Sequence, residues 1–199
     1  QQFRQQSYSV AITDRDGEVL TVLPLADGSW RQFTPLGDLP PTLVEVFQAS
    51  EDERFFVHPG VDPLAVLRAA IDNVRSRSVV SGGSTITMQL ASIIEPSQPG
   101  IPGKVREAAR AIRLELTLSK ATILELWLNS LPFGYATTGV TSAAITFFGT
   151  PVDELTVEQI LLLAVVPRRP ASLSPTEHPA AAAAAATALA ERIGVAVDP

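Results

Sequence analysis

The sequence predicts a mainly α-helical domain that carries a small β-meander at its N-terminal end. Residues 8–33 alternate between apolar and polar side chains, which is typical of short strands. After Pro40 and Pro41 the apolar residues recur every three to four positions, which is typical of helices. The chain has 199 residues, of which 46% are hydrophobic and 18% charged, so it can fold around its own core.

The β region is predicted from two alternating runs, 8–12 and 19–23, with turn residues between them. A second turn leads to Trp30, whose segment would complete the meander. We therefore expect residues 1–35 to form a β-strand region that packs on a main domain of residues 36–199.

The first three predicted helices follow from caps and spacing. Glu51 lies four and eight residues after apolar residues, which puts a carboxylate on an apolar helix face. The N-cap pair 62–63, Asp followed by Pro, predicts the start of the second helix. The glycine-rich stretch 81–85 predicts the start of a third helix, which runs to about Ile94.

The stretch 96–103 contains three prolines and two glycines and is predicted to be a loop. The next helix, 104–118, has apolar residues on two faces, which predicts that it is buried. Further helices are predicted from Ser119 to Pro132, at 140–148, from the Thr156 capping box to Pro167, and at 179–193.

The composition argues against several classes of protein. A net charge of −6 argues against nucleic acid as a partner, and two histidines without cysteine argue against a structural zinc site. The longest apolar run, 160–166, is too short to span a bilayer. Because the chain begins with Gln1 and has no signal pattern, we expect it to be a piece of a longer protein whose membrane anchor lies outside it.

Basic residues are concentrated in one part of this acidic chain. Between Arg68 and Arg113 there are seven Lys or Arg residues and three Asp or Glu residues, which gives a local charge of +4. Such a run is often only a solvated helix face, and that interpretation stays open. The alternative is a site for an anionic substrate or an anionic membrane surface.

Two carboxylates are the candidate catalytic groups. Glu51 would be desolvated on its apolar helix face, which suits a general base or acid, although a structural salt bridge with Arg54 explains it as simply. Glu107 follows Lys104 at the start of a helix, where a glutamate can also merely complement the helix dipole. Glycines before the Ser-Thr pair 84–85 would expose backbone N–H groups to a phosphate or pyrophosphate, but this signal is weak alone.

Five motifs occur in a family-like order, and together they resemble the glycosyltransferase family 51 domain of class A penicillin-binding proteins and monofunctional peptidoglycan polymerases. The resemblance covers about residues 10–180, and the details at 131–134 and 166–170 favour the penicillin-binding protein 1C subgroup. The motifs are Glu51-Asp52-x-x-Phe55-x-x-His58-x-Gly60, Gly82-Gly83-Ser84-Thr85-Ile86-Thr87-x-Gln89-Leu90-Ala91, Glu107 twelve residues before Ser119-Lys120, 123–129 and 161–167.

The resemblance implies a lysozyme-like fold and a processive polymerase that joins lipid II units into a β-1,4 glycan with inversion. It implies that Glu51 takes the proton from the acceptor 4-hydroxyl, and that Glu107 and Lys104 handle the departing undecaprenyl pyrophosphate. The substrate-binding residues that it implies are Asp52, Phe55, His58, Gly83, Ser84, Thr85, Gln89, Lys104 and Arg106.

The same resemblance implies the setting of the domain. Its partners would be lipid II, the nascent glycan strand, an anionic membrane surface and a transpeptidase domain elsewhere in the parent chain, at the outer face of the cytoplasmic membrane. No cofactor is required, and a Mg²⁺ or Mn²⁺ ion near Glu107 is an option.

Three positions depart from the family pattern. Met88 replaces a glutamine, while Ser92 and Gly103 stand where the family usually has basic residues. Each charge-assisted hydrogen bond that the pyrophosphate thereby lacks is worth about 1.5–3 kcal/mol. A weakened member that binds lipid II as a scaffold therefore stays open. A lysozyme-like hydrolase is a further alternative, but a neutral glycan has no pyrophosphate for the basic segment to hold.

Overall fold

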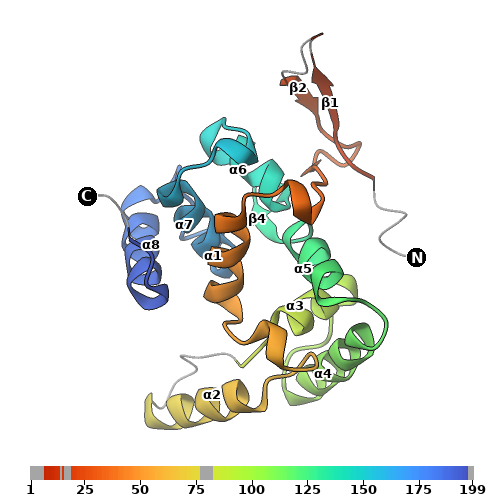
Figure 1. Cartoon of the computed structure of the whole chain (residues 1–199), viewed down its shortest axis with the longest axis vertical. Helices are drawn as coiled ribbons and strands as arrows, with labels where there is room; N and C mark the ends of the chain where they lie inside the picture. Colours follow the sequence, from red (N-terminus) through yellow and green to blue (C-terminus); the bar gives the residue numbers. More distant parts are fainter. Residues whose placement is uncertain (1–6, 14, 16–18, 77–82, 197–199) are drawn as a thin grey trace. The chain divides into compact units, whose positions relative to one another are not determined.

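The computed structural model describes residues 7–13, 15, 19–76 and 83–196, and its contacts divide the chain into two compact units. The terminal unit comprises Gln1–Ser50 and Leu128–Pro199, and the central unit comprises Glu51–Trp127. The elements are mostly helices, so the mainly α-helical fold class is confirmed (Figure 1). The domain boundary that we placed at residue 35 stays a prediction.

The terminal unit begins with the predicted hairpin of β1 (Val10–Thr13) and β2 (Val19–Leu23), which pair antiparallel. The predicted turn between them lies partly outside the described residues. The third strand of the expected meander pairs elsewhere: β3 (Trp30–Arg31) is parallel to β5 (Thr137–Thr138), which is antiparallel to β4 (Pro132–Gly134). Local alternation predicts a strand, but it carries no information on a pairing partner that is about one hundred residues away.

In its described residues, the terminal unit also contains the helices α1 (Pro41–Glu51, whose last residue belongs to the central unit), α6 (Val140–Phe148), α7 (Val157–Val165) and α8 (Pro179–Ile193). As predicted, the Thr156 capping box begins α7, and Gly149, in the left-handed conformation, ends α6. The helices α7 and α8 pack side by side (Figure 1). At the end of α1, the guanidinium groups of Arg168 and Arg192 both donate to the carbonyl oxygen of Ser50. They satisfy a carbonyl that the helix itself leaves unpaired, immediately before Glu51.

The central unit contains α2 (Pro63–Ser76), α3 (Ile86–Ile94), α4 (Ile101–Glu115) and α5 (Lys120–Leu128, whose last residue belongs to the terminal unit). Short 3-10 turns lie at Phe55–Val57 in this unit and at Leu36–Asp38, Val152–Glu154 and Val166–Arg168 in the other. The helices α3 and α4 pack on one another (Figure 1). Fully buried side chains of this unit include Phe55, Ile86, Leu90, Ala111 and Trp127.

The predicted N-cap of α2 is confirmed. The backbone N–H of Leu64 donates to Oδ1 of Asp62 at 2.9 Å. Burial alone would raise the pKa of Asp62, but the backbone N–H groups of Ala65 and Leu64 and the charge of Arg54 hold it below its usual value. The contribution of this cap to stability is therefore present above the unfolded-state pKa and is lost as the pH falls through the folded-state pKa.

Two helix predictions need correction. The helix α4 begins at Ile101 rather than at Lys104, because Pro102 stands in the first turn, where a missing N–H costs nothing. It is not buried on two faces, since Val105 is 63% and Ile112 45% exposed, and its buried residues are Gly103, Glu107 and Ala111. The helix α5 ends at Leu128 rather than at Pro132. The next residue, Asn129, turns its side-chain amide to the backbone N–H and carbonyl of Thr34.

Candidate active site

Glu51 ends α1, is half-buried, and contacts an amide of α3. The Nε2–H of Gln89 donates to Oε2 of Glu51 at 2.8 Å. On its other side, Gln89 accepts a hydrogen bond on Oε1 from the indole N–H of Trp127 at 3.2 Å. Arg54, the structural partner considered for Glu51, forms its ion pair with Asp62 instead.

Glu107 lies on the buried face of α4 and is 7% exposed. The ammonium group of Lys104 donates to Oε2 of Glu107 at 2.7 Å and to Oγ of Ser84 at 3.2 Å. The hydroxyl of Ser92 lies 3.4 Å from the other carboxylate oxygen. Lys104 thus balances the charge of Glu107 and links α4 to the start of α3, while its own side chain stays 59% exposed, so that a ligand can reach it from solvent.

The helix α3 brings the two glutamates together. Gln89, which contacts Glu51, and Ser92, which contacts Glu107, are three residues apart on one helix face. Side chains at this spacing have Cβ atoms about 5–6 Å apart. The two carboxylates therefore lie over neighbouring turns of the same helix, one beside an amide and the other beside a cation.

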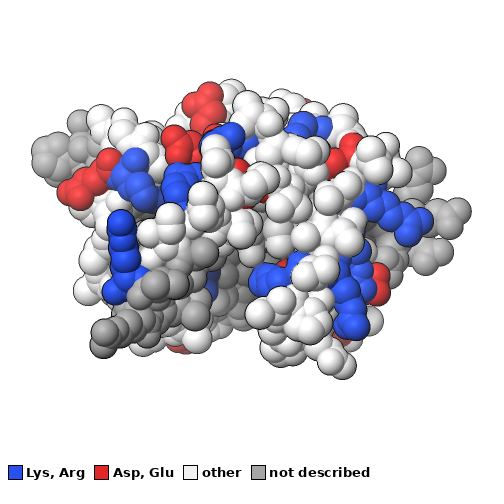
Figure 2. All heavy atoms as spheres, turned by 90° about the horizontal axis from the view of Figure 1, so that it is seen from below, with Lys and Arg blue, Asp and Glu red and all other residues white. Residues whose placement is uncertain are grey.

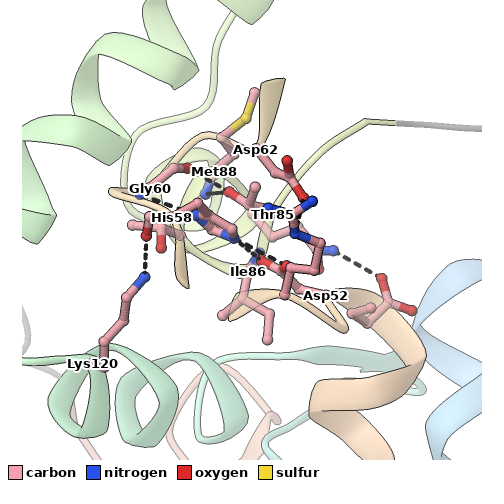
Figure 3. A network of polar contacts seen from close by, with 12 residues as sticks. Asp52, His58, Gly60, Asp62, Thr85, Ile86, Met88 and Lys120 are labelled. Carbon is pink, nitrogen blue, oxygen red and sulfur yellow. Dashed lines mark hydrogen bonds and ion pairs between the residues drawn. The ribbon is translucent and has the colours of Figure 1, made fainter. Parts of the chain in front are cut away.

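The segment after Glu51 is fastened to α3 by a buried polar network (Figure 3). The carboxylate of Asp52 accepts from Nε2–H of His58 at 3.0 Å and from the backbone N–H of Ile86 at 3.1 Å. The backbone N–H of Gly60 donates to Nδ1 of His58 at 3.2 Å, which places the ring proton on Nε2. The hydroxyl of Thr85 donates to the carbonyl of Gly60 at 2.6 Å.

The same network extends to α5 and α4. Lys120 donates to the carbonyl of His58 at 2.7 Å, and its ammonium group lies 4.3 Å from the ring centroid of Phe55. A Cβ on Gly60 would lie 3.0 Å from the backbone of Ala111, and Gly60 has a φ of +91°, so only glycine fits this close approach.

These contacts bear on four residues that we expected to bind substrate. Asp52, His58 and Thr85 are buried and use their polar atoms within the protein, and Phe55 is fully buried. What the structure shows for them is a framework that holds the segment after Glu51 in place. Their contact with substrate stays a prediction.

The start of α3, predicted at the glycine-rich stretch 81–85, is capped by Thr85. Thr85 accepts from the backbone N–H of Met88 at 3.1 Å, and Ser84 presents its hydroxyl to Lys104. A Cβ on Gly83 would lie 2.8 Å from Cα of Val66, so this glycine permits the approach of α2. Gly82 lies outside the described residues. Arg106 is exposed on α4, off the face that contains Glu107.

The surroundings of Glu107 do not form a metal site by themselves. Within residues 7–13, 15, 19–76 and 83–196, no group of three or more His, Cys, Asp or Glu side chains could hold a metal ion. Glu107 supplies a single carboxylate, which already accepts from Lys104, whereas Mg²⁺ and Mn²⁺ prefer several oxygen ligands. The option of an ion at this place stays a prediction.

Two parts of the site were not assigned a role from the sequence. Trp127 orients Gln89, and Lys120 binds the carbonyl of His58. A signal for Trp127 was present, because an indole N–H needs a polar partner when the ring is buried in an apolar helix. The sequence does not indicate which residue supplies that partner.

The amino-acid sequence of this chain is similar to those of known proteins. The family model described as "Transglycosylase" matches residues 16–194. Penicillin-binding protein 1C of Escherichia coli (strain K12) is 39% identical over 184 residues, which are 92% of this chain and 24% of that protein. Penicillin-binding protein 1A of Aquifex aeolicus (strain VF5) is 40% identical over 150 residues, which are 75% of this chain and 21% of that protein.

A crystal structure of penicillin-binding protein 1A from Haemophilus influenzae is also similar, with a TM-score of 0.51 and 19% identity. The match covers 95% of this chain and 18% of that one, and it bears on the fold alone. This chain therefore spans about a quarter or less of the length of these relatives.

Proposed function

Because this chain belongs to the transglycosylase family, we propose that it polymerises lipid II, a lipid-pyrophosphate-linked disaccharide, into the glycan strands of peptidoglycan. The observation that supports this most directly is the pair of glutamates over neighbouring turns of α3. Glu51 accepts a hydrogen bond from the uncharged amide of Gln89, a contact that is compatible with a general base. The other lies beside an exposed lysine, as the binding of an anionic leaving group requires.

In the proposed reaction, Glu51 takes the proton from the 4-hydroxyl of the acceptor sugar. The acceptor oxygen forms a bond to the anomeric carbon of the donor from the face opposite the pyrophosphate. The bond from that carbon to the pyrophosphate oxygen breaks, so the configuration inverts and the electron pair leaves with undecaprenyl pyrophosphate. Lys104 and Ser84 stabilise the charge that develops on the leaving group, and Glu107 holds Lys104 in place.

The test is electrophoresis of glycan strands formed by this chain from labelled lipid II. Strands that lengthen with time support the proposal. Retention of labelled lipid II without product would favour the scaffold alternative, and shortening of added glycan strands would favour a hydrolase. A variant of Glu51 is the control for contaminating polymerase.

The length of the relatives suggests the setting. This chain spans a quarter or less of them, so we propose that the parent protein carries a transpeptidase domain and a membrane anchor beyond these residues. The domain would then act at the outer face of the cytoplasmic membrane. Among the helices of the described residues, none is both long enough and apolar enough to cross a bilayer.

We expect Lys104→Ala to lower the polymerisation rate by about tenfold, because it removes a charge-assisted hydrogen bond to the leaving group. The effect is not larger because the side chain of Lys104 is exposed, and solvent weakens such a bond. Ser92→Lys should change the rate in the opposite direction, since it adds a cation beside Glu107. Both variants are measured in the lipid II assay. If neither changes the rate, the pyrophosphate does not bind at the start of α4.

The central unit exposes apolar and basic side chains together on α2 and α4. Figure 2 views the side on which these helices lie, and basic side chains stand there among a large uncharged area. Leu64, Leu67 and Ile71 of α2 are exposed, as are Ile101, Val105 and Ile112 of α4 and Leu116, which caps its end. Arg68 and Arg75 accompany them, whereas Arg77 lies outside the described residues. This combination is typical of a surface that binds an anionic membrane.

We expect this chain to float with anionic vesicles at low salt and not with zwitterionic ones. Each basic residue near such a surface contributes about 1 kcal/mol, so Arg68→Glu with Arg75→Glu should weaken binding at least about 30-fold. Arg15→Glu with Arg169→Glu, a double reversal of two exposed arginines of the terminal unit, is the matched control for net charge. Equal loss of binding in the control would contradict the assignment of this surface.

A further inference from the structure

Gln89 lies between a group that can only donate and a group that accepts. The indole N–H of Trp127 has no acceptor function, so the atom that faces it at 3.2 Å must be the amide oxygen. The amide nitrogen then faces the carboxylate of Glu51, at 2.8 Å. The two partners thus select one of the two orientations of the amide, which the shape of the side chain alone does not distinguish.

The anchor of this arrangement is rigid. Trp127, a residue of the central unit, is 0% exposed. Its N–H direction is therefore fixed by packing, and the orientation of Gln89 follows from it. Glu51 is a half-buried side chain on the last residue of α1, and the amide of Gln89 is held against its carboxylate.

We propose that Gln89 is a positioning residue for Glu51, and that Trp127 acts through Gln89 by fixing the orientation of its amide. This inference rests on the proposed function of Glu51 as the base. A base must be held within hydrogen-bond reach of the hydroxyl that it deprotonates, and small displacements lower the rate steeply. The positioning of Glu51 by Gln89 is thus expressed in the chemical step, whereas the substrate contact that the resemblance implies for Gln89 would be expressed in the affinity for lipid II.

The kinetic test compares Gln89→Met, Trp127→Phe and the double variant. Methionine keeps the length of the side chain and removes the amide, and phenylalanine keeps an aromatic ring and removes the N–H. Gln89→Met should lower kcat about tenfold or more, because the hydrogen bond that it removes ends on a carboxylate, and Trp127→Phe about 3- to 10-fold, the range of one neutral hydrogen bond. KM should change less than about twofold in each. Because Trp127 acts through Gln89, the double variant should have the kcat of Gln89→Met. Effects that multiply, or a loss expressed in KM, would overturn the proposal.

A spectroscopic test covers the case in which Trp127→Phe folds poorly. The chain contains two tryptophans, so its ¹⁵N–¹H spectrum has two indole resonances, which Trp30→Phe assigns. Gln89→Met should shift the Trp127 resonance and leave that of Trp30 in place. An unshifted Trp127 resonance would overturn the proposal. If this resonance shifts but the unmodified chain forms no glycan, the hydrogen-bonded chain is supported and the proposed function fails.

Discussion

Glu51→Gln is expected to lower the polymerisation rate about 10²- to 10⁴-fold, the usual contribution of a general base. The substitution keeps the shape of the side chain and removes its ability to accept the proton of the acceptor hydroxyl. The fold should not change, since an amide oxygen at this position can still accept from Nε2–H of Gln89. The rate is measured in the lipid II assay, and the thermal unfolding of both proteins is compared.

The matched control is Glu53→Gln. Glu53 lies two residues away and is exposed, so the same change of charge and shape should leave the rate within about twofold, as for most surface substitutions. A Glu51→Gln protein that retains more than about a tenth of the rate would contradict the assignment of the base, whatever the control does.

The parts of the fold that the sequence predicted well are those with local causes. Thr156 with Gln159, Asp62 before Pro63, and Thr85 after the glycines are caps whose hydrogen bonds close within a few residues. Such signals do not depend on the rest of the chain. The predicted starts of α2, α3 and α7 are accordingly confirmed.

The parts that could not be predicted depend on distant partners. Two apolar faces were visible on the 104–118 helix, but periodicity does not say which face another element covers. The structure covers the face of Gly103, Glu107 and Ala111 and leaves Val105 exposed.

The same limit applies to the candidate site. The resemblance singled out both glutamates, and their neighbours on α3 follow from the structure. Gln89 and Trp127 are 38 residues apart in the sequence, and no local pattern connects them. The resemblance implied that Asp52 and His58 bind substrate, and that contact stays a prediction. Their burial is evident only once the 52–62 segment is seen against α3.

Gly103 shows how a departure from a family pattern can have a structural cause. A Cβ at this position would lie 1.8 Å from the carbonyl oxygen of Gln98, far inside van der Waals contact. The segment cannot simply move away, because Arg110 of α4 donates to the carbonyl of Glu95 at 2.8 Å and to Oγ of Ser97 at 3.0 Å. Position 103 therefore lacks a basic residue because the loop that contains Gln98 runs directly over the start of α4 and leaves room only for glycine.

We accordingly expect Gly103→Arg, which restores the cation of the family pattern, to destabilise the protein rather than to raise its activity. The free energy of unfolding should fall by about 3 kcal/mol, at the upper end of the cost of overpacking, because backbone rather than a flexible side chain must move. Val105→Arg is the control, since it adds the same side chain two residues later at a position that is 63% exposed, and it should be nearly neutral. Chemical denaturation measures both. A Gly103→Arg protein of unchanged stability and higher polymerisation rate would show that the loop yields, and that this position lacks only a charge.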